Sequence, residues 1–346
     1  MTIWLVASDI GSFNTIYPVG CCLDNMGYEI NWQLSGKSIE LFEKNDKKWV
    51  ENKLSEKPKV IITGMSNNIY EYEIAIQWKD RCPIIAIPDI WSSPFFASGW
   101  KEGKLFPDIM CVNDKMGLAA VRSWGFNGWV IKTGWPMLDR YSFKIDRSQC
   151  KEKIRKKLSL TDETKIVFFI GQGEQENTEA LFELLNVLAE GQFDFPVVVA
   201  PRQHLNTTSE EWERWNLVIS GREDVVLKTD ELSSEEVLLG ADVVISDFST
   251  MLTEAVVNGI PAISILYPGK PVVEKYSSWE WSNNTFPLAT LGCCPVASNQ
   301  NRLATILREA LDGRWEKYFE AAKNVFYLKG NSQRVAMVVK GVLEAF

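Results

Sequence analysis

Hydroxyl and carboxylate side chains stand close together in residues 241–267, which read ADVVISDFSTMLTEAVVNGIPAISILY. An apolar run is followed by a polar turn and then by an amphipathic helix that carries Glu254 about one turn in. Free N–H groups at a helix start favour bound anions, and hydroxyls beside them add hydrogen-bond donors. The spacing therefore predicts a phosphate-binding turn, with Glu254 placed to meet a ribose. The residues of the predicted turn are Ser246, Asp247, Ser249 and Thr250. The alternative is a helix capped by Ser249 and Thr250, with Glu254 as a surface carboxylate.

Two carboxylates in the first half follow apolar runs in the same way. Asp9 lies in the sequence SDIGS and Asp89 in PDIWSS. A carboxylate at such a position is a candidate general base. Gly11 lets the backbone approach a ligand closely, and Trp91 beside a carboxylate and two hydroxyls suits a polyol. The alternatives are that Asp9 and Ser12 only cap the following helix, and that Asp89 is a structural turn residue.

Two further loops in the second half carry polar groups after apolar runs. Gly171, Gln172 and Gly173 resemble a phosphate cradle at a helix start, although nearby glutamates also satisfy the helix dipole without a ligand. Arg202 and His204 suit a diphosphate or a sugar carboxylate. For His204 the alternative is a structural histidine.

These loops need strands to position them, and apolar runs do alternate with helical periodicity along the chain. Strands are expected at 3–7, 29–34, 60–63, 84–87, 109–112 and 129–133, and then at 165–170, 196–200, 225–228, 243–245 and 262–266. This alternation predicts an α/β protein with two Rossmann-like domains built on parallel sheets. We place the first domain at 1–145 and the second at 146–320, with a C-terminal helix at 321–346 that crosses back to the first. Because ligands bind at the carboxyl ends of parallel strands, we expect the loops to line a cleft between facing sheets.

Composition restricts the classes of function. The chain has 346 residues and a net charge of −8, which argues against a nucleic-acid-binding surface. One histidine and seven cysteines without CxxC spacing predict reduced thiols and no metal site, and no cofactor is expected. The N-terminus lacks the pattern of a signal peptide and no segment has the apolar length of a membrane span, so a cytoplasmic protein is expected.

An aromatic-rich stretch, WSSPFFASGW at residues 91–100, suggests burial between domains. The alternative is contact with a lipid-linked acceptor or with the inner face of a membrane. The sequence carries no signal for an oligomeric state.

Several segments together resemble one superfamily. Residues 241–269 resemble the donor-binding region of GT-B glycosyltransferases and of the related non-hydrolysing UDP-N-acetylglucosamine 2-epimerases. The segments VVVAPRQHLN, LVASDIGSFNTIYPVGCCLDNMGYEI and IKTGWPMLD resemble other parts of the same superfamily. The resemblance implies a GT-B fold, with Ser249 and Thr250 facing phosphate and Glu254 the ribose hydroxyls.

The chain departs from the epimerases in two loops. It has IPDIW where they carry a His-x-Glu-Ala-Gly-type loop, and GEQEN where they carry an Arg-Arg-Glu-Asn run. Epimerase chemistry needs two acid/base groups flanking C2, and Asp89 would have to replace the missing glutamate. Arg202 is the clear basic candidate for the diphosphate, which favours an inverting mechanism over a retaining one.

The sequence thus predicts a metal-independent, inverting glycosyltransferase. It would move a sugar from a nucleotide-diphosphate donor, UDP-linked, to a hydroxyl of a sugar or lipid-linked acceptor, in the biosynthesis of a cell-surface polysaccharide. Asp9, or failing that Asp89, would act as base, with His204 as a further catalytic candidate. The alternatives are a nucleotide-sugar 2-epimerase and a non-catalytic GT-B-like binding protein.

Overall fold

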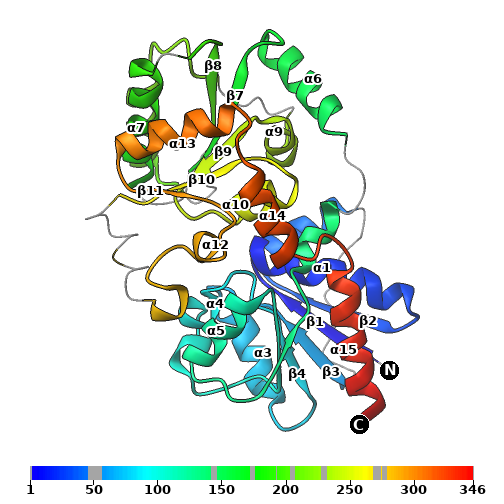
Figure 1. The fold of residues 1–346 in the computed structure, drawn as a ribbon. Coiled ribbons are helices and arrows are strands. Elements are labelled where there is room, and N and C mark those ends of the chain that lie inside the picture. The colour runs from blue at the N-terminus through cyan, green and yellow to red at the C-terminus, as the bar shows by residue number, and fades with distance from the viewer. Residues whose placement is uncertain are drawn as a thin grey trace. The chain divides into compact units, whose positions relative to one another are not determined.

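The structure is a computed structural model that describes residues 2–45, 57–141, 146–171, 176–191, 193–202, 207–226, 232–267, 274 and 279–345. The chain forms two compact units (Figure 1). The first unit contains Met1–Phe143 together with Phe326–Phe346, and the second contains Lys144–Val325. Within the described ranges, every helix is too short or too polar to cross a bilayer.

The first unit is built on a six-stranded parallel sheet in the order β2-β1-β3-β4-β5-β6. Every residue of β1 is buried, as expected for a central parallel strand covered on both faces. The strands are β1 (Thr2–Ala7), β2 (Glu29–Leu34), β3 (Val60–Thr63), β4 (Ile84–Ala86), β5 (Ile109–Val112) and β6 (Trp129–Lys132).

The helices of the first unit come from both ends of the chain. They are α1 (Ile10–Asn25), α2 (Lys37–Lys44), α3 (Tyr70–Trp78), α4 (Ser93–Phe96), α5 (Lys115–Ser123) and α15 (Asn331–Ala345), with short 3₁₀ turns at Trp100–Glu102 and Pro136–Tyr141. Val335 and Val339 of α15 pack into one core cluster with Ile3 and Leu5 of β1. Asp139 fixes the start of α15 by accepting hydrogen bonds from the N–H groups of Asn331 and Ser332. In Figure 1 the red helix α15 accordingly lies with the blue N-terminal elements.

The second unit is built on a five-stranded parallel sheet in the order β11-β10-β9-β7-β8. Its strands are β7 (Lys165–Ile170), β8 (Val197–Arg202), β9 (Val243–Ser246), β10 (Ala262–Ile265) and β11 (Val296–Ala297). The strand expected at 225–228 is not formed in its described part, because Val225 makes only an isolated bridge to Val199. Residues 227 and 228 lie outside the described residues.

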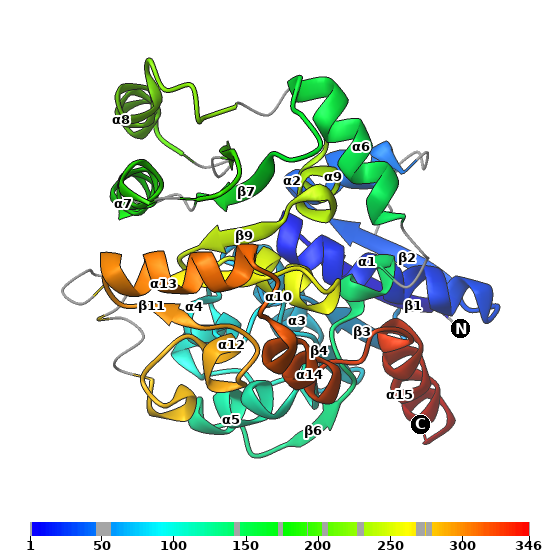
Figure 2. The same ribbon diagram turned by 45° about the horizontal axis from the view of Figure 1, so that its top comes forward.

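Helices cover this sheet and bury a large core cluster around Phe169, Leu184 and Trp215. The helices are α6 (Arg147–Leu158), α7 (Glu176–Glu190), α8 (Ser209–Ile219), α9 (Ser234–Gly240), α10 (Thr250–Val257), α12 (Pro287–Thr290), α13 (Gln300–Leu311) and α14 (Glu316–Val325), with a 3₁₀ turn at Glu280–Ser282. Helices α7 and α13 lie side by side (Figure 2).

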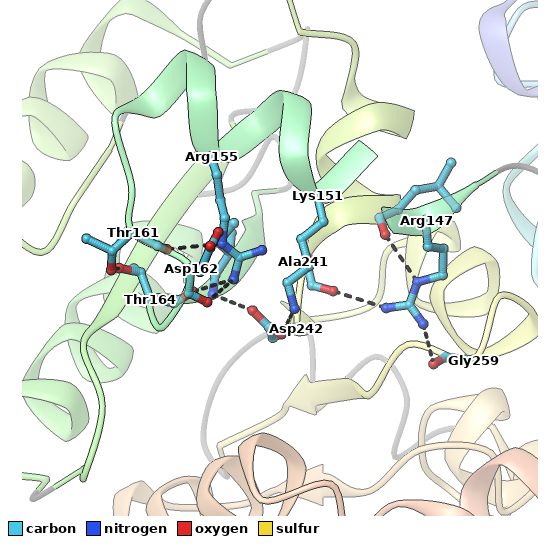
Figure 3. Close-up of polar contacts among 11 residues, drawn as sticks. Arg147, Lys151, Arg155, Thr161, Asp162, Thr164, Ala241, Asp242 and Gly259 are labelled. Carbon is cyan, nitrogen blue, oxygen red and sulfur yellow. Dashed lines mark hydrogen bonds and ion pairs between the residues drawn. The ribbon is translucent and has the colours of Figure 1, made fainter. Parts of the chain in front are cut away.

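Helix α6 is held at the amino ends of the second sheet's strands (Figure 3). Arg147 donates hydrogen bonds to the carbonyl oxygens of Leu239, Ala241 and Gly259. Lys151 Nζ pairs with Asp242 Oδ1 at 2.5 Å, and Asp242 directly precedes β9. Arg155 donates to the carbonyl oxygens of Thr161, Asp162 and Thr164, just before β7. These contacts therefore occupy the edge of the sheet opposite to the loops that the sequence singles out.

Candidate functional site

In the first unit, three strands deliver their following loops to one edge of the sheet. Val6 of β1 pairs with Thr63 of β3, and Thr63 pairs with Ala86 of β4. Strand β1 lies between β2 and β3. The connection after β1 therefore leads toward one end of the strand order, and the connection after β3 leads toward the other end. Such a switch point is the usual ligand position in an open parallel sheet. The loops that meet here carry Asp9 and Asp89, as the sequence predicted from their strand-end positions.

Asp9 is the N-cap residue of α1. Its Oδ1 accepts a hydrogen bond from Ser12 N at 2.8 Å, while Ser12 Oγ accepts from Asp9 N at 3.2 Å. This reciprocal arrangement is a capping box. The capping interpretation of Asp9 and Ser12 is therefore correct for the geometry, and any catalytic role of Asp9 has to coexist with it.

Asp89 lies against the first turn of α1. A Cβ atom at residue 11 would stand only 2.1 Å from Asp89 Oδ2, so the absence of a side chain at Gly11 makes room for this carboxyl. Ser93 Oγ donates to Asp89 Oδ1 at 2.5 Å.

The surroundings of Asp89 favour its protonated form. Burial, followed by the charge of Asp9, raises the pKa of Asp89 to about 7, although the bond from Ser93 acts in the opposite direction. The residue nevertheless keeps some solvent exposure. A carboxyl that exchanges its proton near neutral pH suits general acid–base chemistry.

Glu71, which the sequence analysis did not single out, is entirely buried beside these residues. Its Oε1 accepts hydrogen bonds from Ser8 N and Ser8 Oγ, both at 2.9 Å, and its Oε2 accepts from Ser66 N at 2.7 Å. Burial, followed by the charge of Asp9, raises the pKa of Glu71 to about 7. Glu71 thus joins the loop after β1 to the loop after β3.

Trp91 is packed in the interior of the first unit. Its indole nitrogen lies 2.9 and 3.1 Å from the two carboxylate oxygens of Asp114, and its ring meets the ring of Trp135 edge-on at 5.4 Å. Asp114 in turn caps α5 by accepting from the N–H groups of Met116 and Gly117. Trp91 is only 5% exposed, so its surroundings are those of a core residue.

The second unit repeats the same arrangement with different side chains. Ile170 of β7 pairs with Arg202 of β8 on one side and with Ser246 of β9 on the other. Gly171, Arg202 and the turn after β9 therefore share the carboxyl edge at a second switch point.

Serine hydroxyls in and beside the turn after β9 fix its conformation. Ser246 Oγ donates to the carbonyl oxygen of Ile170 at 2.7 Å, and Ser264 Oγ donates to the carbonyl oxygen of Asp247 at 2.5 Å. Ser249 is the N-cap of α10 and accepts from Met251 N at 3.2 Å. A hydroxyl that accepts in this way retains its own proton for donation. Thr250 is the first helical residue and is partly exposed.

Glu254 and Arg202 act on each other in the second unit. Glu254 is 2% exposed, so it is not the surface carboxylate of the alternative interpretation. Burial lowers the pKa of the Arg202 guanidinium from its ordinary value, and the charges of Glu235 and Glu254 oppose that shift. The Arg202 guanidinium also lies 3.9 Å from Met251 Sδ, in the first turn of α10.

Gly171 ends β7 in close packing. Its N–H donates to the carbonyl oxygen of Arg202 at 2.7 Å, and a Cβ here would stand 2.7 Å from the Trp215 ring. The other candidates in these two loops, Gln172, Gly173 and His204, lie outside the described residues. In the part of the chain that the structure describes, no group of three or more His, Cys, Asp or Glu side chains is placed to hold a metal ion.

Neither a protein-family model nor a curated protein sequence matches this chain. Solved structures do match along the whole length. The Staphylococcus aureus MnaA–UDP structure has 14% identity and a TM-score of 0.74, with 100% of this chain and 97% of that chain covered. The UDP-GlcNAc 2-epimerase of Methanocaldococcus jannaschii, in complex with UDP-GlcNAc and UDP, has 11% identity and a TM-score of 0.69, with 98% and 100% covered. A glycosyltransferase from Rickettsia africae has 13% identity and a TM-score of 0.66, with 100% and 99% covered.

This chain has the GT-B fold. The predicted fold class is thereby confirmed, and the resemblance to GT-B glycosyltransferases and UDP-GlcNAc 2-epimerases holds for the fold. At sequence identities of 11 to 14%, these structural matches establish shared architecture alone. The choice between the activities found on this fold therefore rests on the site residues.

Proposed function

We propose that this protein is a glycosyltransferase that moves a sugar from a UDP-linked donor to an acceptor hydroxyl. The observation that carries the proposal is Asp89, a partly exposed residue at a switch point whose carboxyl pKa is raised to about 7. The fold supports a nucleotide-sugar substrate, because the matched MnaA structure contains UDP and the matched epimerase structure contains UDP-GlcNAc and UDP.

The donor is assigned to the second unit. The N–H groups at the start of α10 and the hydroxyls of Ser249 and Thr250 would bind the diphosphate, with Arg202 adding positive charge. Glu254, one turn further along α10, would accept hydrogen bonds from the ribose hydroxyls. The loop of Gly171 to Gly173 and His204 are assigned to the donor on the sequence alone.

The base is assigned to Asp89 in the first unit. Its carboxylate takes the proton of the acceptor hydroxyl as that oxygen attacks the anomeric carbon, and the bond from the anomeric carbon to the diphosphate oxygen breaks. In-line attack of this kind inverts the anomeric centre. The charge that develops on the leaving diphosphate is met by the α10 N-terminus and its hydroxyls. Asp89 is preferred to Asp9 because the Asp9 carboxylate is engaged in the α1 cap.

A 2-epimerase is the second candidate, favoured by the full-length match to the Methanocaldococcus jannaschii enzyme. Proton removal and return at C2 call for two acid/base groups that reach the sugar. Glu71 has a raised pKa like Asp89 but is entirely buried, which leaves Asp9 as the second group. The transferase proposal requires only one such group.

A thermal-shift panel of nucleotides and nucleotide sugars tests the proposal. Ligand at a hundred times its Kd stabilises a protein by about 2.7 kcal/mol, so UDP and the true donor should raise the melting temperature clearly. The donor is then incubated with sugar acceptors, and separately in D₂O without acceptor. Sugar transfer supports the proposal, whereas deuterium at C2 without acceptor identifies an epimerase. Nucleotide-sugar binding without either reaction identifies a binding protein, and no shift with any nucleotide overturns the nucleotide-sugar assignment.

A further inference from the structure

The buried carboxylate of Glu71 joins two loops that are far apart in the sequence. It receives the backbone N–H of Ser8, which follows β1, and the backbone N–H of Ser66, which follows β3. The hydroxyls of Ser8 and Ser66 lie 2.8 Å apart and close the same network. A buried N–H that loses its acceptor is costly, so these two loops depend on Glu71 for their positions.

The loop after β1 and the first turn of α1 carry two of the groups that surround Asp89. Asp9 directly follows Ser8. After burial, the charge of Asp9 is the second largest cause of the raised pKa of Asp89. Gly11, two residues further on, leaves the space that the Asp89 carboxyl occupies. A shift of this loop would therefore change both the space around Asp89 and the charge that acts on it.

We propose that Glu71 is a positioning residue for Asp89, acting through the loop that carries Asp9 and the first turn of α1 that carries Gly11. This inference rests on the proposed function in so far as it concerns turnover. Glu71 is entirely buried and both of its carboxylate oxygens already accept hydrogen bonds from Ser8 and Ser66, which are buried with it, so its role here is structural.

The network spans the switch point of the first sheet. Ser12 Oγ also accepts from Ser8 N at 3.2 Å, and a Cβ at Gly64 would stand 2.4 Å from Ser12 Cβ. The start of α1 is thus packed directly against the loop after β3. A small displacement of Glu71 would therefore also displace the start of α1. Displacements of about 1 Å at a catalytic group can lower turnover by about 100-fold.

Glu71→Gln, compared with Glu73→Gln, tests this role. Both variants remove one carboxylate from the first turn of α3, but Glu73 is exposed and Glu71 is not. In Glu71→Gln the amide nitrogen faces a backbone N–H where a carboxylate oxygen stood, so at least one loop loses its acceptor. Ser8→Ala, which removes only one hydroxyl from the network, serves as the milder variant if Glu71→Gln does not fold.

Two measurements need no turnover. Hydrogen–deuterium exchange at the Ser8 and Ser66 amides should accelerate at least tenfold in Glu71→Gln and stay unchanged in Glu73→Gln. The Asp89 carboxyl, followed by ¹³C NMR and assigned with Asp89→Asn, should titrate at lower pH in Glu71→Gln, because Asp9 moves away from it. Unchanged exchange and an unchanged Asp89 midpoint would overturn the proposal even if the protein proves to be no transferase.

The third measurement uses sugar transfer. Glu71→Gln should lower kcat about 10- to 100-fold, leave the donor KM within about twofold, and move the pH midpoint of kcat downward with the NMR midpoint. A loss of stability alone would lower the active fraction without moving either midpoint. A wild-type protein without turnover would contradict the proposed function, while the exchange and NMR results would still decide the role of Glu71.

Discussion

The carboxyl edges of the two sheets share one backbone plan and differ in chemistry. In each sheet the first strand lies between its two successors, and polar loops follow at that point. The first unit places Asp9, Glu71 and Asp89 there, whereas the second places Ser249, Thr250 and Arg202 there, with Glu254 behind them. The first edge therefore holds protons near neutral pH, and the second offers donors and positive charge to an anion.

Burial acts differently on the two edges. For Glu71 and Asp89 burial and the charge of Asp9 both favour the neutral acid. For Arg202 burial favours the neutral form, but Glu235 and Glu254 favour the cation. The comparison shows that neighbouring carboxylates act in opposite directions on the two edges, because they favour the neutral form of a buried acid and the charged form of a buried guanidinium.

Asp89→Asn should have the largest effect on the first edge, because it removes the proposed base without changing side-chain size. We expect turnover to fall by about 10²- to 10⁴-fold while the Kd for UDP stays the same. Steady-state kinetics and isothermal titration calorimetry measure the two quantities. Asp80→Asn, at an exposed residue of the same unit, is the control. Full turnover in Asp89→Asn would move the base assignment to Asp9.

The first unit should also lose stability as pH rises from about 5 to 8. Asp89 and Glu71 have folded-state pKa values of about 7, above the values of about 4 for unfolded chains, so the folded state binds more protons across this window. Their protonation therefore stabilises the fold below about pH 4, and that contribution is lost as pH rises through 7. The loss is on the order of 3 kcal/mol per carboxyl.

Thermal melts at several pH values measure this dependence. The difference between wild type and Asp89→Asn isolates the contribution of Asp89, and the variant should be relatively more stable at pH 8 than at pH 5. If the melting temperatures of the two proteins differ by the same amount at every pH, Asp89 titrates at its ordinary pKa.

Gly11→Ala should disturb the first edge while leaving the second intact. The new Cβ would stand 2.1 Å from Asp89 Oδ2, so the carboxyl has to move, and we expect turnover to fall by about 10- to 100-fold. Gly341→Ala is the matched control, since it lies in helix α15 and its Cβ would meet nothing within 4 Å. Equal activity of the two variants would show that Asp89 does not depend on this contact.

Glu254→Gln tests the second edge, where it changes the carboxylate proposed to bind the ribose. Losing a charged hydrogen-bond acceptor for the ribose should weaken UDP binding by about tenfold, and kcat at saturating donor should change little. Calorimetric titration with UDP gives the Kd, and Glu213→Gln, an exposed glutamate of the same unit, is the control. Unchanged UDP affinity would remove the ribose assignment from Glu254.

The strands were predictable because a buried parallel sheet requires continuous apolar runs, which are visible locally. The predicted strands of the first sheet end within one residue of β1 to β6. The position of Asp9 and Asp89 at one edge followed from the same reasoning. The prediction at 225–228 was wrong for Val225, because an apolar run has no sheet position of its own until its neighbours are known.

Glu71 was not predictable from the sequence, and the reason is physical. Its bonds run to Ser66 nearby and to Ser8, which is 63 residues away along the chain. In the sequence YEYE each glutamate follows a tyrosine, and only the contacts of the folded chain distinguish the buried Glu71 from the exposed Glu73. The capping roles of Ser249 and Asp9 were visible as alternatives because capping is a local interaction.

Helix α15 has a consequence for the order in which the protein is made. The core around Ile3 and Leu5 is completed by Val335 and Val339, so this core stays incomplete until the residues of α15 have been translated. The second unit is one uninterrupted segment and has all its residues earlier. Domains generally fold as units during synthesis. The first unit, whose strands precede those of the second unit in the chain, is therefore completed only after every residue of the second unit has been translated.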